Sequence, residues 1–269
     1  PPFFFQVEDG IRAVERARWL GDVYKRQAMA RLGGTTIDLN PTTSQIGRGE
    51  LIKDTARVLS KYCDALAIRT FNQDDLIEYA KWFKKPVINA LTDLEHPCQA
   101  LADFLTIQEE FKDLNNVKLA FIGDGNNVAR SLAIACALLG MRFILAAPKQ
   151  YQFDESFKNR VTSLAPDAQV EQTEDPTAAV QDAVAVYTDV WASMGQEKER
   201  EARQTAFRPY QINSKLMANC PNAIFMHCLP AQIGHEVTED VFRSSKSIVW
   251  KQAYNRMIAQ KKLLQFIYQ

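Results

Sequence analysis

The sequence predicts an α/β protein in which two parallel-sheet domains are joined by a linking helix and by a C-terminal helix. From Ala28 onward, short apolar runs alternate with amphipathic stretches of helical period, which is typical of parallel α/β architecture. The chain has 269 residues, enough for two domains, and a polar break at Lys112–Asn116 interrupts the alternation. With 46% hydrophobic and 24% charged residues, we expect a folded globular protein.

In the first half of the chain, short apolar runs predict strands and the amphipathic stretches between them predict helices. The predicted strands are Thr35–Leu39, Ala65–Arg69 and Pro86–Ala90. The predicted helices are the end of a helix at Ala28–Gly34, then Gly49–Ser60, Asp74–Phe83 and a longer one at Pro97–Phe111. This alternation indicates a parallel sheet whose strands are connected by helices.

The second half restarts the pattern with a buried-strand run at Val117–Gly123, followed by a helix at Val128–Leu139. Further strand-like runs occur at Phe143–Ala147, Ala183–Thr188, Ala223–His227 and Ser247–Trp250. The closing stretch, Asn255–Tyr268, has the pattern of one amphipathic helix. We therefore expect a second parallel sheet after the polar break.

The charge balance excludes two classes of partner. Lys and Arg number 32 and Asp and Glu number 32, which argues against unselective binding to nucleic acid or to an anionic membrane. The longest apolar stretch, Leu132–Ala147, is broken by Arg142 and falls short of the roughly 18 residues that a membrane span needs. The five cysteines are an odd number without CxxC spacing, which favours a reducing, cytoplasmic location.

Polar motifs follow several predicted strands, where α/β enzymes place their ligands. The first is Gly123–Asn127 (GDGNN), which lacks the third glycine of a dinucleotide fingerprint and the acidic residue that would hold a ribose. A dinucleotide site is therefore disfavoured. The motif either contributes to another ligand site or only caps and turns the chain.

The second motif, His96-Pro97-Cys98-Gln99, follows a predicted strand and opens a helix. An imidazole and an amide at a helix N-terminus suit an anionic or carbonyl-bearing ligand, although a capping turn with a buried cysteine has the same pattern. Cys98 and Cys228 each lie close to a histidine, but neither pair has the spacing of a structural zinc site. We therefore expect no metal.

Two more motifs lie at strand ends. His227-Cys228-Leu229-Pro230 offers a cysteine that is either reactive or a packed small hydrophobe, without the spacing of a thiol protease. Asp189–Gly195 offers a carboxylate and a hydroxyl that could hold an ammonium group, or that could cap a helix. Arg69 and Arg256 lie at a strand end and at the start of the last predicted helix, and a single arginine in such a place is usually solvated. The convergence of such groups on strand ends indicates one site.

A series of longer motifs contains these residues and follows one another in chain order. They are SQIGRGE at Ser44–Glu50, DTARVLSKYCDALAIRT at Asp54–Thr70, HPCQALADFLT at His96–Thr106, FIGDGNNV at Phe121–Val128, TDVWASMGQE at Thr188–Glu197, FMHCLPA at Phe225–Ala231 and NRMIAQ at Asn255–Gln260. With them the chain resembles the aspartate/ornithine carbamoyltransferase family over Ala28–Gln269. HPCQ, DxxxSMG and HCLP are similar to its ornithine branch, whereas HPTQ and HPLP are expected of the aspartate branch.

The resemblance implies that the side-chain amine of L-ornithine attacks carbamoyl phosphate, which yields citrulline and phosphate without a metal or organic cofactor. It implies that carbamoyl phosphate is held by Gln45, Arg69, His96, Gln99 and Arg256, with the backbone around Cys228 and Leu229. It implies that ornithine is held by Asn127, Asp189, Ser193 and Met194. The catalytic residues would be Arg69, His96, Arg256 and Cys228, the last as proton acceptor. Homotrimers, or multiples of trimers, are also implied, with the loop around Gln45 reaching into a neighbouring subunit's site.

The chain departs from the family pattern before Ala28. The family places a Ser-Thr-Arg-Thr-Arg phosphate loop and then Ser-Phe-Glu there, whereas this chain has GDVYKRQ. Residues 1–27 are similar instead to translated sequencing-adapter sequence, and we expect them to replace neither the first strand nor the leading helix. The expected domains are then 28–111, an incomplete carbamoyl-phosphate domain onto which 255–269 packs back, and 117–250, an ornithine domain.

Two consequences for function follow from this departure. Without the phosphate loop, we expect the polypeptide to have little activity, as a truncated form of an ornithine carbamoyltransferase. The alternative is a non-catalytic homologue that binds ornithine and has its own N-terminal sequence. A smaller departure is Tyr254, where the family often has Glu before Asn-Arg.

Overall fold

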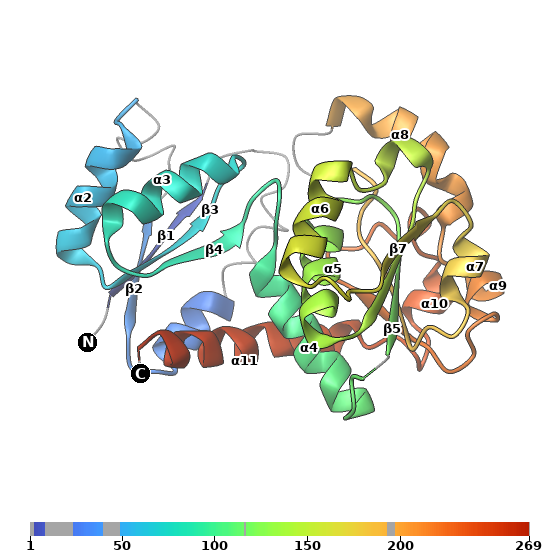
Figure 1. The fold of residues 1–269 in the computed structure, drawn as a ribbon. Coiled ribbons are helices and arrows are strands. Elements are labelled where there is room, and N and C mark those ends of the chain that lie inside the picture. The colour runs from blue at the N-terminus through green and yellow to red at the C-terminus, as the bar shows by residue number, and fades with distance from the viewer. Residues whose placement is uncertain (1–2, 9–23, 40–48, 116, 193–196, 269) are drawn as a thin grey trace. The chain divides into compact units, whose positions relative to one another are not determined.

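A computed structural model describes residues 3–8, 24–39, 49–115, 117–192 and 197–268 (Figure 1). Contacts between residues divide the chain into two compact units, unit 1 (Pro1–Ala102 with Asn255–Gln269) and unit 2 (Asp103–Tyr254). Each unit contains one parallel sheet connected by helices. The predicted fold class, α/β with two parallel sheets, is confirmed.

The sheet of unit 1 has the strand order β2-β1-β3-β4, and every neighbouring pair is parallel. Its strands are β1 (Phe3–Glu8), β2 (Thr35–Leu39), β3 (Ala65–Arg69) and β4 (Val87–Leu91). Its helices are residues 24–30, α2 (Ile52–Tyr62), α3 (Gln73–Phe83), the first part of α4 (Pro97–Phe111) and the second part of α11 (Val249–Ile267).

Strand β3 shows how this sheet acquires a core on each face. Successive side chains of a strand point to opposite faces. Leu66 and Ile68 pack in one cluster with apolar residues of α2 and α3, whereas Ala65 and Ala67 pack in a second cluster with Met29 and residues of α11. The buried run in β3 therefore reflects helices on both faces, as parallel sheets require.

Strand β1 corrects one expectation. Residues 1–27 were expected to supply no strand, yet Phe3–Glu8 pairs with β2 on one side and with β3 on the other. The run Phe3–Val7 has the aromatic and β-branched composition that favours a strand, and this propensity is independent of family resemblance. Residues 9–23 lie outside the described part of the chain.

The sheet of unit 2 has the strand order β7-β6-β5-β8-β9, again parallel throughout. Its strands are β5 (Lys118–Ile122), β6 (Arg142–Ala146), β7 (Val170–Thr173), β8 (Ala185–Thr188) and β9 (Ile224–His227). Its helices are the second part of α4, α5 (Asn127–Leu139), α6 (Glu155–Leu164), α7 (Pro176–Val180), α8 (Arg200–Phe207), α9 (Ser214–Met217), α10 (Glu239–Phe242) and the first turn of α11, with short 3₁₀ turns η3 (Lys149–Tyr151), η4 (Glu197–Glu199) and η5 (Arg208–Tyr210).

The strand order determines where a ligand site can form. The chain runs from β5 to β6 and β7 on one side and then returns to β8 and β9 on the other, so the order reverses between β5 and β8. Crevices of open α/β sheets lie at such reversals, beyond the carboxyl ends of the strands. In unit 1 the corresponding reversal lies between β1 and β3, and β3 ends at Arg69.

Most predicted elements are confirmed within a few residues, but Ser247–Trp250 differs, and β1, β7 and the helices α6 to α10 were not predicted. Ser247–Trp250 is not a strand: Ser247 makes an isolated bridge to Phe225, and α11 begins at Val249, six residues before the predicted start of the last helix. The apolar residues of this segment lie at the start of a helix, where a short run does not distinguish the two structures. Strand β7 (Val170–Thr173) was not predicted, because it is partly exposed and has a polar composition.

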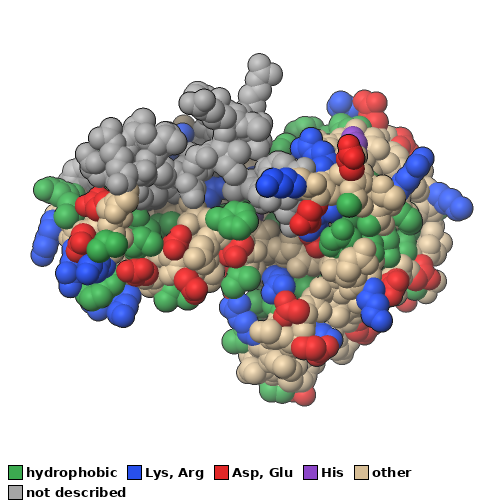
Figure 2. All heavy atoms as spheres, turned by 90° about the horizontal axis from the view of Figure 1, so that it is seen from above, with side chains coloured by type: hydrophobic (Ala, Val, Ile, Leu, Met, Phe, Trp, Pro, Cys, Tyr) green, Lys and Arg blue, Asp and Glu red, His purple; other side chains and the backbone are tan. Residues whose placement is uncertain are grey.

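The surface and the cysteines agree with the composition. On the face drawn in Figure 2, basic and acidic side chains of the described residues are interspersed. All five cysteines lie in the described part of the chain, where they are buried and form no disulfide. Among the described helices, none is long and apolar enough to cross a membrane.

Candidate active site

The GDGNN loop joins β5 to α5, and its residues have structural roles. The Asn126 side-chain oxygen accepts hydrogen bonds from the backbone N–H groups of Val128 (3.0 Å) and Ala129 (3.1 Å). A Cβ at Gly125 would lie 2.9 Å from the Tyr151 carbonyl oxygen, so the close approach requires glycine. Because Asn126 already caps α5, the loop does not offer these N–H groups to a pyrophosphate, which argues further against a dinucleotide site.

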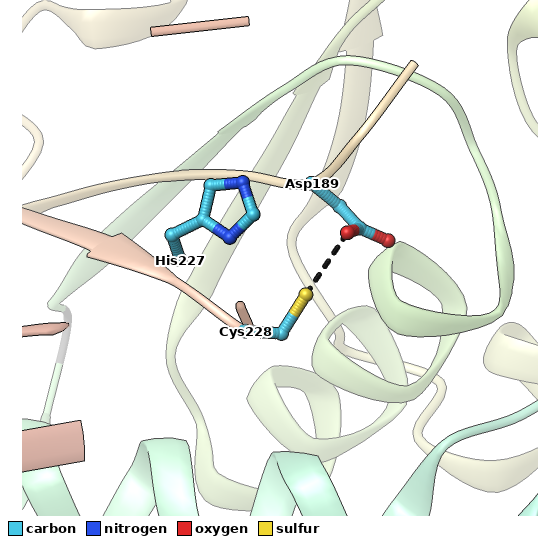
Figure 3. Close-up of side chains that lie close together, drawn as sticks. All are labelled: Asp189, His227 and Cys228. Atoms are coloured by element: carbon cyan, nitrogen blue, oxygen red, sulfur yellow. Dashed lines mark hydrogen bonds between the residues drawn. The ribbon is translucent and has the colours of Figure 1, made fainter. Parts of the chain in front are cut away.

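The loops after β5, β8 and β9 meet at Asp189, and Figure 3 shows the Cys228 thiol directed at its carboxylate. Asn126 Nδ2 donates to Asp189 Oδ2 at 2.9 Å, and the Cys228 thiol donates to Asp189 Oδ1 at 3.0 Å. Oδ1 also accepts the backbone N–H of Val190 at 2.8 Å. Three motifs that are far apart in the sequence therefore form one cluster in unit 2, which we call the thiol–carboxylate cluster (Asn126, Asp189, Cys228). Asn127 follows Asn126 in the sequence. It is the first residue of α5 and is partly exposed.

The loop that carries Cys228 is held by His227 and Glu236. His227 Nδ1 accepts the backbone N–H of Leu229 at 2.8 Å, which places the ring proton on Nε2, 3.2 Å from Glu236 Oε1. Both side chains are completely buried. Glu236 Oε1 also accepts the backbone N–H of Gln232 at 2.5 Å, so one carboxylate fixes both ends of the loop.

Asp189, His227 and Cys228 offer potential metal ligand atoms within 4.8 Å of one another. The histidine fits this role poorly. Its Nδ1 lone pair is engaged by the Leu229 N–H and its Nε2 faces Glu236, so an incoming metal ion would have to displace one of these bonds. The geometry thus supports a histidine that shapes the loop.

In unit 1, His96 lies among cations at the start of α4, and we call Arg69, His96, Gln99 and Arg256 the arginine–histidine cluster. Burial, and then the positive charges of Arg256, Arg69 and Lys25, hold the pKa of His96 well below its usual value of 6.5. Arg69 ends β3 and Arg256 lies on α11, so elements distant in the sequence meet here. The imidazole is neutral at pH 7 and is surrounded by fixed positive charge, an arrangement suited to a phosphate with an adjacent carbonyl.

Cys98 and Gln99 of the HPCQ motif are buried in the first turn of α4, whereas Pro97 is partly exposed. Gln99 is 1% exposed. Cys98 packs in the apolar cluster beneath the sheet, its thiol donates to the Asn89 carbonyl at 3.3 Å, and burial raises its pKa. Cys98 is therefore the buried cysteine of the capping-turn interpretation, whereas Cys228 makes a polar contact through its thiol.

Several residues of these clusters were not identified from the sequence. Lys25, 3% exposed, adds a third cation beside His96. Tyr24 accepts a hydrogen bond from Arg256 at 2.5 Å, and the guanidinium lies over its ring at 4.3 Å. A capping role was one alternative for the asparagines of GDGNN, but the bond of Asn126 to Asp189 was not foreseen, and nothing near Glu236 in the sequence signals its pairing. Gln45, Ser193 and Met194 lie outside the described residues.

A buried ion pair supports the strand ends of unit 2. Arg203 of α8 donates to Asp124 of the GDGNN loop at 2.6 Å and to the Trp191 carbonyl oxygen at 3.3 Å. The two charged side chains are 7% and 12% exposed. Burial raises the pKa of the Asp124 carboxyl, and the charge of Arg203 opposes that shift. Arg203 therefore connects the loop after β5 to the loop after β8.

Comparison with known families gives two matches that together span most of the chain. Residues 25–109 match the carbamoyl-P binding domain of aspartate/ornithine carbamoyltransferase, and residues 115–267 match its Asp/Orn binding domain. Three members of the arginine–histidine cluster, Arg69, His96 and Gln99, lie in the region that matches the carbamoyl-P binding domain. Arg256 and the whole thiol–carboxylate cluster lie in the region that matches the Asp/Orn binding domain.

Individual relatives agree with these matches. The ornithine carbamoyltransferase of Prochlorococcus marinus strain MIT 9312 is 57% identical over 239 residues, which cover 88% of this chain and 78% of the relative. That of Nostoc punctiforme is 52% identical with the same coverage. Among solved structures, ornithine carbamoyltransferase from Pyrococcus furiosus is 45% identical with a TM-score of 0.90, covering 98% of this chain and 83% of that one. The Gloeobacter violaceus enzyme is 42% identical with a TM-score of 0.85, covering 98% and 85%.

Proposed function

Because the chain belongs to the aspartate/ornithine carbamoyltransferase family, we propose that its reaction is the transfer of the carbamoyl group from carbamoyl phosphate to the side-chain amine of L-ornithine, as in arginine biosynthesis. The products are citrulline and phosphate. The observation that carries the proposal is the contact of the Cys228 thiol with Asp189, which joins the HCLP and DxxxSMG motifs of the ornithine branch. The relatives named above are ornithine carbamoyltransferases, which supports the choice of amine.

We assign carbamoyl phosphate to the arginine–histidine cluster. Arg69 and Arg256 supply fixed positive charge for the phosphate and for the oxygen that becomes negative in the tetrahedral intermediate. His96 remains neutral beside them, so it serves as a hydrogen-bond partner of the carbamoyl oxygen without adding a titrating charge. Gln45 and Gln99, and the backbone at Cys228 and Leu229, complete this assignment.

We assign ornithine to Asn127, Asp189, Ser193 and Met194. The Asp189 carboxylate is suited to the α-ammonium group, and Asn126 orients that carboxylate through a 2.9 Å hydrogen bond. The attacking amine must lose a proton, and Cys228 in its thiolate form accepts it. In support of this assignment, the thiol lies 3.0 Å from Asp189, the residue that we assign to ornithine.

We also propose that residues 1–269, as they stand, turn over slowly. GDVYKRQ occupies the place where the family has Ser-Thr-Arg-Thr-Arg, and it contributes one buried lysine, Lys25. Each charge-assisted hydrogen bond lost from phosphate is worth roughly 1.5–3 kcal/mol, so two or three together lower the rate by several orders of magnitude. Replacing the stretch before Ala28 by Ser-Thr-Arg-Thr-Arg followed by Ser-Phe-Glu should restore turnover.

The test is citrulline formation by the chain and by the loop-replaced variant, with Asp189→Asn in the loop-replaced background as the negative control. A loop-replaced variant that forms no citrulline while remaining folded would overturn the proposed reaction. A rate near that of a family member from the unaltered chain would overturn only the proposed slow turnover. Calorimetry with ornithine alone addresses the alternative, because a non-catalytic ornithine-binding homologue should bind it without carbamoyl phosphate.

The assembly and the location are further parts of the proposal. We propose a homotrimer or a multiple of trimers, as the family resemblance implies, and light scattering after size-exclusion chromatography measures its mass. Five buried cysteines without a disulfide among the described residues support a reducing compartment such as the cytoplasm.

A further inference from the structure

A buried amide lies behind the loop that carries Cys228. Gln252, in the first turn of α11, is 1% exposed, and its Oε1 accepts the backbone N–H of His227 at 3.0 Å. Its Nε2 donates to Asp103 Oδ1 at 2.7 Å and contacts the Tyr187 hydroxyl oxygen at 3.0 Å. The Tyr187 hydroxyl donates to Asp103 Oδ2 at 3.0 Å. Every polar atom of the Gln252 side chain is thus engaged inside unit 2.

These partners determine how the amide must point. A backbone N–H can only donate and an ionised carboxylate can only accept, so Oε1 must face His227 and Nε2 must face Asp103. Burial, and then the charge of Asp103, raise the pKa of Tyr187 well above its usual value, which keeps the phenol protonated as a donor. The three side chains come from α11, α4 and β8, so the end of β9 is tied to three other elements.

His227 is therefore held from two sides. Gln252 fixes its backbone, while its ring bonds to the Leu229 N–H and faces Glu236. Cys228 is the next residue, and its thiol lies 3.0 Å from Asp189. We infer that Gln252 is a positioning residue, which places the Cys228 thiol against Asp189 through the backbone of His227. The functional meaning of this role rests on the proposed function, in which Cys228 meets the attacking amine.

The substitution Gln252→Glu tests the inference because it changes only the donor end of the side chain. The groups that face this end are Asp103 of α4 and Tyr187 of β8, and the charges of Cys228 and Asp189 also act on Tyr187. Two buried carboxylates in contact share one proton, so the variant keeps a donor toward Asp103 at acid pH and loses it at alkaline pH. Gln252→Leu removes the donor and the acceptor at every pH.

The measurement is the rate at which iodoacetamide alkylates Cys228, followed by mass spectrometry of the peptide, in the full chain as it exists. We expect the rate of Gln252→Glu relative to the parent to be near one at about pH 6 and to rise to about tenfold by about pH 9, as the shared proton is lost. For Gln252→Leu we expect a roughly tenfold increase across the range, because the loop no longer holds the thiol in place.

A matched control is Gln172→Glu on β7. Gln172 Oε1 also accepts a backbone N–H, that of Phe153 at 2.7 Å, but it has no bond to β9. We expect its relative rate to stay near one at every pH. Relative rates near one for both Gln252 variants in folded protein would overturn the inference, as would an increase in Gln252→Glu that does not change with pH. If Gln252→Leu does not fold, the pH dependence of Gln252→Glu decides alone. Alkylation needs no turnover, so failure of the proposed reaction leaves this test intact.

Discussion

The two clusters differ in how they organise polar groups. In unit 1, burial and then the charges of three cations, Arg256, Arg69 and Lys25, lower the pKa of His96 and keep it neutral. In unit 2, polar groups are matched in pairs of opposite character, as in Asn126 with Asp189 and Arg203 with Asp124. One region gathers charge of one sign, whereas the other cancels it internally.

The difference indicates which of the two clusters would be stabilised by a bound ligand. Like charges brought together in a partly buried site repel each other, and a bound anion relieves that repulsion, so a site of this kind gains affinity for an anion at the expense of stability. Complementary pairs stabilise the folded chain without a ligand and orient side chains before a substrate arrives. Removing a cation of the arginine–histidine cluster should therefore change binding more than stability, and breaking a complementary pair of unit 2 should change stability.

The largest expected effect on stability is that of Arg203→Met. Removing the arginine leaves Asp124 buried without its partner, which should lower the free energy of unfolding by about 3 kcal/mol. The control is Arg243→Met, which breaks the exposed pair of Arg243 with Glu239 and should cost no more than about 0.5 kcal/mol. Urea unfolding measures both variants. Equal losses would contradict the importance of buried complementary pairs in unit 2.

Arg256→Met should have the opposite profile. Losing one of the clustered cations should weaken carbamoyl phosphate binding about 10- to 100-fold, because a charge-assisted hydrogen bond contributes roughly 1.5–3 kcal/mol. The melting temperature should change little, because relief of repulsion offsets the lost contact with Tyr24. Titration calorimetry and thermal melting measure the two quantities. If Arg256→Met left the affinity for carbamoyl phosphate unchanged but greatly lowered the melting temperature, the proposed contrast between the two units would be wrong.

The neutral state of His96 predicts a pH dependence of stability. Its pKa is 6.5 when unfolded and far lower when folded, so the unfolded chain takes up a proton first as the pH falls. The stability contribution is present above pH 6.5 and declines below it, by at most about 1.4 kcal/mol at about pH 5.5. His96→Gln should lack this decline. Urea unfolding at both pH values compares the two chains, and parallel losses would exclude His96 as the cause.

The smallest expected effect separates the two functions of Asn126. Asn126→Ser keeps a side-chain oxygen that can cap α5 but loses the donor to Asp189, which should cost about 1 kcal/mol. Asn213→Ser is the matched control, because Asn213 caps α9 by accepting the Leu216 N–H. We expect the control to change stability by only a few tenths of a kcal/mol. Equal costs for the two variants would show that the bond to Asp189 contributes nothing.

Sequence patterns predicted the strands β2 to β6, β8 and β9 within a few residues, and they proposed the residues of the candidate site. Runs such as Ala65–Arg69 are buried on both faces, so their composition alone indicates parallel strands. Arg69, Asp189 and Cys228 were identified because motifs at strand ends have a recognisable location in α/β folds. Strand β7 was missed because its side chains are polar and partly exposed, and β1 because its segment lacks resemblance to the family.

By itself, the sequence determined the fold class, the family resemblance and the motifs that we assign to the candidate site, since these follow from local composition and residue order. Only the tertiary structure showed that Asn126, Asp189 and Cys228 meet, that Glu236 fixes the ring of His227, and that Gln252 holds its backbone. Residues as far apart as Gln252 and Asp103 are brought together only by the packing of α11 and α4. Hydrogen bonds between distant elements leave no local signal in the sequence. Which two residues pair depends on which side chains the fold brings within reach of each other.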